Sequence, residues 1–239
     1  MIDAVRFGTY VDDPGRVAGR LQGATVSVKL DSIPTIYGYV GSLRAWIRAD
    51  RLWVRGSLPT FLGKMAPLSR PLVSVAQERM EDTLGVDLGA AHVWGLELTA
   101  DLRLSRPVGG YFPLLLRCPR LQRVEYGGES VAFAARVRRL TFYDKAVECR
   151  KRKKPVPSGN VLRLELQFRK RVALQLGADG PFTFADLHDR DWWPHLVVLC
   201  FTYLSPVRMT VAAVRCESLP VATVGIHDVD LLVRASIAT

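Results

Sequence analysis

Three segments of the chain alternate apolar and polar residues over seven or more positions, and this pattern constrains the fold more than any other feature. Residues 93–104 read VWGLELTADLRL, residues 139–145 read RLTFYDK and residues 161–169 read VLRLELQFR. Successive side chains of a strand point to opposite faces, so each segment has one apolar face and one polar face. The alternation predicts an antiparallel sheet that buries one face in a core and leaves the other open.

Shorter patterns complete the expected fold. Residues 24–30, 43–49 and 51–56 alternate as short strands, and the last two form a hairpin around Asp50 and Arg51. Residues 67–85 carry apolar side chains at helical spacing, with Gly85 suited to end that helix. Residues 170–176 and 189–204 also look helical. We therefore expect an α+β domain over residues 1–205, with helices on one face of the sheet, and a C-terminal extension over residues 206–239 that packs on it.

Charge and composition narrow the class of partner. The chain has 239 residues, 49% of them hydrophobic, so it can bury a sizeable core. Its formal net charge of +10 favours polyanions, first of all nucleic acid. No signal sequence and no run of ~18 apolar residues is visible, which predicts a cytoplasmic protein without a membrane partner. The four cysteines form no CxxC pair and the four histidines no HxH or HExxH pair, which argues against zinc.

Acidic residues occupy the polar faces of the predicted strands although the protein is rich in arginine. Glu97 and Asp101 lie on one strand and Glu165 on another. Charged residues on an open sheet face are ordinary, so a purely solvated face remains an alternative. If the strands are neighbours, however, the carboxylates converge and need a cation among them. Oxygen ligands of this kind favour Mg²⁺ or Mn²⁺.

A tyrosine and a lysine share the third polar face. The phenol of Tyr143 is a poor nucleophile at neutral pH, because its ordinary pKa is about 10. A nearby divalent ion and the ammonium of Lys145 would favour the phenolate and neutralise charge on an attacked phosphodiester. Basic residues around this strand would hold the DNA backbone by salt-sensitive contacts. They are Arg136, Arg138, Arg139, Arg150, Lys151, Arg152, Lys153, Lys154, Arg163 and Arg169, and Trp46 is the candidate for stacking on an unpaired base.

Four landmarks in order resemble the rolling-circle replication initiators of filamentous phages and related plasmids, the gene II/gene X family. They are the opening MIDAVRF, the segment GSLPTFLGK at residues 56–64, the strand VWGLELTADL, and LTFYDKAVE followed by VLRLELQFRK. The resemblance spans about residues 1–205. It implies a metal-dependent DNA-nicking endonuclease and strand transferase in the cytoplasm of a bacterial host.

The resemblance also implies roles for single residues. Tyr143 matches the nucleophile that keeps the 5′ phosphate, Lys145 and Glu148 match the rest of its motif, and Glu97 and Glu165 match the acids of the other strands. Glu148 thereby joins the expected metal ligands. The implied partners are single-stranded or locally melted origin DNA, a host helicase and a polymerase.

The chain departs from the family pattern at two positions. Gly95 stands where the family usually has arginine, and Thr60 where lysine is common. Tyr126, in a glycine-flanked loop, is a rival nucleophile. A non-catalytic DNA-binding regulator on the same scaffold is the alternative function, and an RNA-binding module is a third.

Overall fold

The computed structural model describes residues 1–28, 33–203 and 207–209, and most of its strands form one large sheet. Ten strands hydrogen-bond in the order β2-β3-β4-β5-β1-β6-β11-β10-β9-β8, and each pair is antiparallel. The strands are β1 (Ile2–Tyr10), β2 (Gln22–Ser27), β3 (Thr35–Val40), β4 (Leu43–Arg48), β5 (Arg51–Ser57), β6 (His92–Leu104), β7 (Leu115–Arg117), β8 (Gln122–Tyr126), β9 (Ser130–Ala134), β10 (Arg138–Asp144), β11 (Asn160–Phe168) and β12 (Arg208–Met209). The three alternating segments correspond to β6, β10 and β11, and β11 lies between the other two, which meets the condition for their polar side chains to converge.

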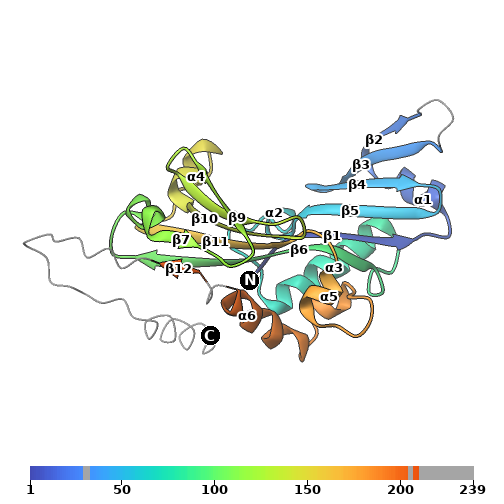
Figure 1. The fold of residues 1–239 in the computed structure, drawn as a ribbon. Helices are drawn as coiled ribbons and strands as arrows, with labels where there is room; N and C mark the ends of the chain where they lie inside the picture. Colours follow the sequence, from blue (N-terminus) through green and yellow to red (C-terminus); the bar gives the residue numbers. More distant parts are fainter. Residues whose placement is uncertain (29–32, 204–206, 210–239) are drawn as a thin grey trace, which may run out of the picture.

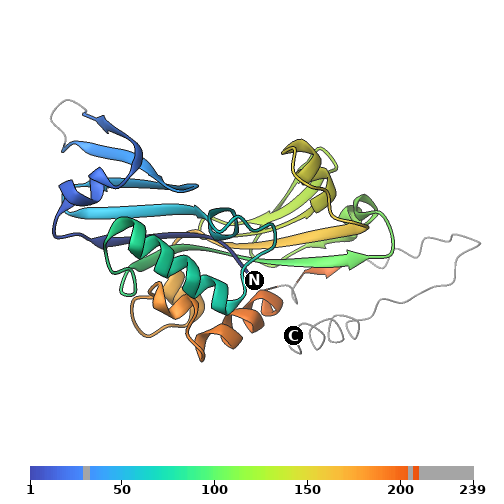
Figure 2. The same cartoon turned by 180° about the vertical axis from the view of Figure 1, so that it is seen from behind.

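Six α-helices accompany this sheet in the described part of the chain. They are α1 (Pro14–Gly19), α2 (Leu58–Phe61), α3 (Arg70–Leu84), α4 (Lys145–Lys151), α5 (Val172–Leu176) and α6 (Trp192–Thr202), with 3₁₀ turns η1 (Val108–Leu114) and η2 (Ala185–Leu187). In Figures 1 and 2, α3, α5 and α6 lie below the sheet, whereas α4 lies above it. The predicted α+β class is confirmed, and α4 is the exception to helices on one face.

The core lies between the sheet and the lower helices. Strand alternation turns Leu98, Leu164 and Leu166 toward the helices, and each is fully buried. Helix α3 buries Val73, Ala76, Met80 and Leu84 at helical spacing, and Gly85 ends it with φ 66°. Fully burying one such large apolar side chain contributes ~1.5–3 kcal/mol, so this apolar layer fixes which face of each strand points up.

Two β-bulges between β1 and β6 break the alternation. Ile2 pairs with Leu98 but Ala4 with Glu97, so Asp3 is an extra residue on β1. Arg6 pairs with Gly95 and Phe7 with Val93, so Trp94 is extra on β6. Strict alternation with Leu96 and Leu98 would put Trp94 on the apolar face, but the bulge turns the ring under the guanidinium of the exposed Arg6, whose carbon lies 5.7 Å from the ring centre.

The segment after Tyr143 is a helix rather than a continued strand. Strand β10 ends at Asp144, whose carboxylate accepts hydrogen bonds from the backbone N–H groups of Ala146 and Val147 and so caps α4. Lys145 is therefore the first residue of α4, and the prediction that it shares a strand face with Tyr143 is wrong. The basic run from Arg150 lies on the last turn of this helix and the turn that follows it.

The predicted C-terminal extension lies mostly outside the described residues. Only Val207 to Met209 of it are described, and β12 pairs there with β7. Cys118 and Cys149 are buried free thiols, and Cys216 and His227 lie outside the described part. Among the described residues, no helix combines the length and the apolar character that a membrane crossing requires.

Candidate active site

The phenol of Tyr143 lies on the polar face of the sheet and is hydrogen-bonded to a carboxylate. Tyr143 is opposite Arg163 in the β10–β11 register, and its Oη donates to Glu165 Oε1 at 2.5 Å. Burial first, and then the negative charge of Glu165, raise the pKa of Tyr143 above its ordinary value. The phenol is thus neutral in this arrangement, and its proton already points to an acceptor.

Three carboxylates from three adjacent strands meet beside this phenol. Asp3 of β1, Glu97 of β6 and Glu165 of β11 each offer an oxygen, and these atoms lie within 4.8 Å of one another. Burial, followed by the negative charges of Glu165 and Asp3, raises the pKa of Glu97 to about 8, and burial also raises the pKa of Glu165. We call these three residues the acid cluster.

The donor set of the acid cluster fits a hard divalent cation. Such an ion takes carboxylate oxygens and would relieve the mutual repulsion that adds to burial in raising the pKa of Glu97. Thr99 lies opposite Glu165 in register on the same face, and its buried hydroxyl has no hydrogen-bond partner among the described residues. Thr99 is therefore a buried polar group next to Glu165 that no described residue satisfies.

Asp3 owes its place to the first bulge. With strict alternation Asp3 would share the apolar face of Val5 and Phe7, but the extra residue turns it to the polar face. Its Oδ1 accepts a hydrogen bond from Ser57 Oγ at 2.9 Å, which ties it to the GSLPTFLGK segment. Sequence reasoning missed Asp3, although a charged residue between the apolar Ile2 and Val5 was the available signal.

Asp101 lies outside the acid cluster although it was expected among the metal ligands. Its two oxygens accept hydrogen bonds from Nε and Nη2 of Arg163, at 2.5 and 2.6 Å. The Arg163 side chain is only 4% exposed, and its Nη1 lies 3.7 Å from Asp3 Oδ2. This bidentate pair fixes a guanidinium beside both Tyr143 and the acid cluster.

Glu148 also lies outside the acid cluster, because it forms ion pairs with two basic side chains. Its carboxylate contacts Lys145 Nζ at 2.5 Å and Arg152 Nε at 2.9 Å. Burial opposes the charge, but the hydrogen bond from Lys145 outweighs it with help from the other cations and lowers the pKa of Glu148. The ion pair holds the buried Lys145 ammonium at the wall of a pocket that Tyr143 and the acid cluster also line. This pocket has a volume of about 240 Å³.

Comparison with known proteins finds only weak structural similarity to solved structures. No protein-family model matches the chain, and no curated protein is similar to it in sequence. The chain is similar to the rolling circle replication initiator protein from Geobacillus stearothermophilus, with 14% identity and a TM-score of 0.48 over 93% of this chain and 91% of that one. The di-domain ARO/CYC protein BexL aligns with a TM-score of 0.27 and 10% identity over 91% of this chain and 99% of its own. The di-domain ARO/CYC protein StfQ aligns with a TM-score of 0.27 and 9% identity over 85% of this chain and 98% of its own. Structural similarity at this level says nothing about function. A functional proposal therefore has to rest on the geometry of the site.

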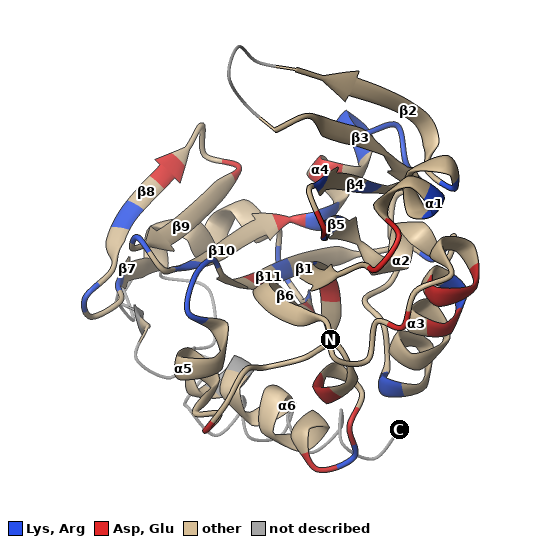
Figure 3. Cartoon of the chain, turned by 90° about the vertical axis from the view of Figure 1, so that its right-hand side faces the viewer, with Lys and Arg blue, Asp and Glu red and all other residues tan. Residues whose placement is uncertain are grey.

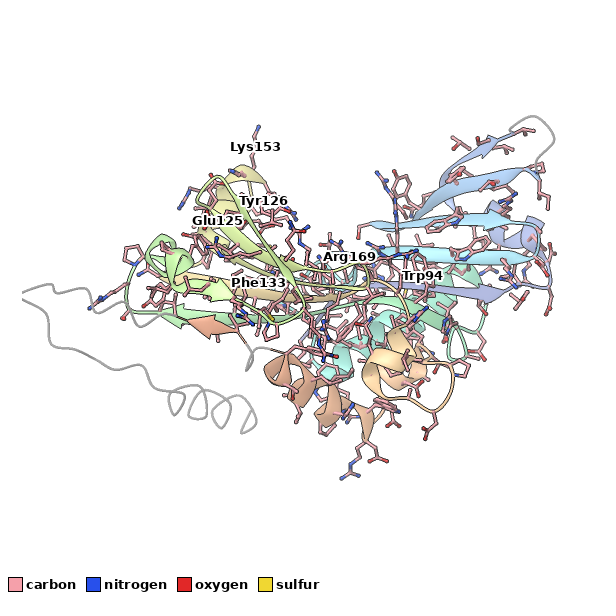
Figure 4. The ribbon with its side chains drawn as sticks, in the orientation of Figure 1. Trp94, Glu125, Tyr126, Phe133, Lys153 and Arg169 are labelled. Carbon is pink, nitrogen blue, oxygen red and sulfur yellow. The ribbon has the colours of Figure 1, made fainter. Side chains whose placement is uncertain are left out.

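The predicted DNA-binding residues do not form one group. Arg152 and Lys154 line the pocket of Tyr143, and Arg136 is exposed in the turn between β9 and β10. Arg150 and Lys153 are exposed near the end of α4, where Figure 4 shows Lys153 projecting away from the sheet, and Lys151 is paired with Glu129. Arg139 and Arg169 lie on the polar face, where the Arg139 guanidinium carbon is 5.2 Å from the centre of the Tyr126 ring.

Two of these arginines do not fit the expected role. Arg138 is opposite Phe168 in register, and its guanidinium carbon lies 4.1 Å from the Tyr203 ring centre. Arg138 is therefore on the helix side, because it alternates with Arg139. Arg163 is buried against Asp101 and is not free to hold a DNA backbone.

Proposed function

We propose that this protein nicks and rejoins one DNA strand at a rolling-circle replication origin, with Tyr143 as the nucleophile. One observation carries the proposal: the phenol of Tyr143 donates a 2.5 Å hydrogen bond to a carboxylate of the acid cluster. A nucleophile, a proton acceptor and a candidate metal site are thereby adjacent.

The proposed reaction is a transesterification. Tyr143 Oη forms a bond to phosphorus, the phosphorus–O3′ bond breaks, and the phenolic proton passes to Glu165. The 3′ oxygen takes up a proton from solvent and leaves as a hydroxyl that a polymerase can extend. The reverse attack by a 3′-hydroxyl rejoins the strand and returns the proton to Tyr143.

Neighbouring cations support the charged intermediates. Arg163 lowers the cost of a phenolate on Tyr143, since its guanidinium lies beside it. Lys145 is held by Glu148 at the wall of the same pocket, where it would neutralise charge on the attacked phosphate. Asp3, Glu97 and Glu165 would hold Mg²⁺ or Mn²⁺, which supplies Lewis-acid withdrawal of charge from the phosphodiester.

A covalent-adduct assay tests this function. A random-sequence pool of single-stranded DNA, labelled at its 3′ ends, is incubated with the protein and Mn²⁺. Because the 5′ phosphate stays on the tyrosine, the labelled 3′ fragment should migrate with the protein in a denaturing gel. We expect an adduct from the wild type and none from Tyr143→Phe.

The matched control is Tyr126→Phe, which removes the exposed rival phenol on β8 and should leave the adduct unchanged. An adduct that survives in Tyr143→Phe, or is lost in Tyr126→Phe, contradicts the assignment. DNA binding by the wild type without any adduct would favour a non-catalytic DNA-binding regulator.

A further inference from the structure

We propose that a second pocket, next to the acid cluster, binds a backbone phosphate of the same single DNA strand while a neighbouring base stacks on an aromatic row. The inference rests on the proposed function and adds a binding site to it. The pocket has a volume of about 410 Å³ and shares Ala4, Ser57, Glu97 and Gln167 with the pocket of Tyr143. A strand whose phosphate lies at Tyr143 therefore continues directly into it.

Four arginines line this pocket. Arg44, Arg55 and Arg6 are directly opposite one another across β4, β5 and β1, and Arg169 follows β11. None of the four forms an ion pair with a described residue. Burial, followed by the positive charges of Arg139 and Arg6, lowers the pKa of Arg169, as expected where cations gather. Such a cluster of forked donors suits an anionic, multidentate group such as phosphate.

Arg6 reaches the pocket by lying across a glycine. A Cβ built on Gly95 would be 2.8 Å from Arg6 Cδ, so the arginine occupies the space that a side chain at position 95 would take. Its guanidinium continues over the Trp94 ring at 5.7 Å. Arg169, which Figure 4 labels, lines the same pocket as Arg6 and Gly95. The space beside Gly95 is thus filled by an arginine of the neighbouring strand β1.

An aromatic row runs beside the arginines. Tyr37, Trp46 and Trp53 are directly opposite one another across β3, β4 and β5. The two indoles are stacked, with ring centres 6.0 Å apart and planes at 11°, and Trp53 lies over Gly8, where a Cβ would be 2.9 Å from its Cδ1. Tyr37 is 48% exposed, so this end of the row is open to a ligand.

The two rows match the chemistry of single-stranded nucleic acid. They are two residues apart along the strands, which is ~7 Å, and each crosses the strands at ~4.8 Å per step. Proteins that bind single strands combine a cationic groove for the backbone with aromatic rings for the bases. The rows lie on the same polar face as the acid cluster, so phosphates on the arginines and bases on the aromatic row direct the strand toward Tyr143.

The salt dependence of DNA binding distinguishes the contribution of the four arginines from that of the aromatic row. The probe is a fluorescein-labelled oligothymidylate, and its anisotropy is measured in EDTA on a Tyr143→Phe background, where neither metal nor adduct contributes. Arg55→Ala should lower the slope of log K against log salt by ~0.7, because one phosphate contact to a single strand is lost. Trp53→Leu should weaken binding on the order of tenfold at an unchanged slope, because stacking carries no charge.

Two further variants complete the test. Arg190→Ala, in the exposed turn between η2 and α6, removes the same charge outside both pockets and should change binding by about twofold at most. If Arg55→Ala lowers the melting temperature of the protein, Arg44→Gln at an exposed position of β4 takes its place, and the slope of log K against log salt is measured again. If the pocket variants behave like Arg190→Ala, the phosphate assignment is overturned, and the adduct assay still judges the nicking function separately.

Discussion

At the scale of single residues, ionisation of the Glu97 carboxyl group destabilises the folded state. Its pKa is about 8 because it is buried and close to Glu165 and Asp3. The folded state therefore binds this proton more tightly than the unfolded chain does, where glutamate has its ordinary pKa. The resulting stability is fully present below the ordinary pKa and is lost as the pH rises through about 8.

Glu97→Gln should remove this pH dependence. The amide keeps an oxygen that can accept the 2.7 Å hydrogen bond from Gln167 Nε2, and it carries no charge. In urea titrations with EDTA, we expect equal stability of variant and wild type at about pH 4 and an advantage for the variant on the order of 4 kcal/mol at about pH 9. A difference that stays constant with pH would contradict the assigned pKa.

Glu97 also shows how much of the site the alternation of apolar and polar residues predicts. Glu97, Tyr143 and Glu165 were predicted to converge because each follows a period of two from buried leucines or phenylalanines, and they do converge. Asp3 was missed, because only the pairing with β6 reveals the bulge that turns it over. Asp101 is on the predicted face, but its bidentate contact with Arg163 depends on which strands are neighbours.

At the scale of elements, the junction between β10 and α4 positions the lysine of the site. The chain turns from strand to helix within one residue, and Asp144 caps the new helix through two backbone N–H groups. Sequence periodicity could not reveal this junction, since RLTFYDK continues to alternate as far as Lys145. The informative signal is an aspartate followed within one turn by Glu148 and then by the basic Arg150 and Lys151, a charge order that is typical of a short helix rather than a strand.

Asp144→Ala should loosen this junction. Loss of the cap is expected to lower the free energy of unfolding by ~1 kcal/mol, and the freed α4 should slow adduct formation because Lys145 loses its fixed position. Asp144→Asn can still cap the helix and is the matched control. Unfolding curves and adduct time courses measure both effects, and an asparagine variant as impaired as the alanine variant would count against a capping role.

At the scale of the whole molecule, the sheet forms a trough whose floor is the site. In Figure 3 the strands β2 to β4 rise on one side and β8 and β9 on the other, with the helices α5 and α6 beneath and α3 at the right. The acid cluster takes one residue from each of β1, β6 and β11, the three central strands that join the two arms. An ion held there would cross-link the centre of the sheet, so its effect should reach the entire fold.

Divalent metal should therefore stabilise the whole domain. A ligand that binds only the folded state adds ~2.7 kcal/mol at one hundred times its Kd, which corresponds to ~5–10 °C for a chain of this size. We expect Mn²⁺ to raise the melting temperature of the wild type by this amount at about pH 8, and EDTA to reverse it. Asp3→Asn should lose most of the increase although it removes a charge from a repulsive cluster, whereas Asp50→Asn, in the exposed turn between β4 and β5, should keep it. Equal metal responses of these two variants would show that the ion binds elsewhere, because only Asp3 belongs to the acid cluster.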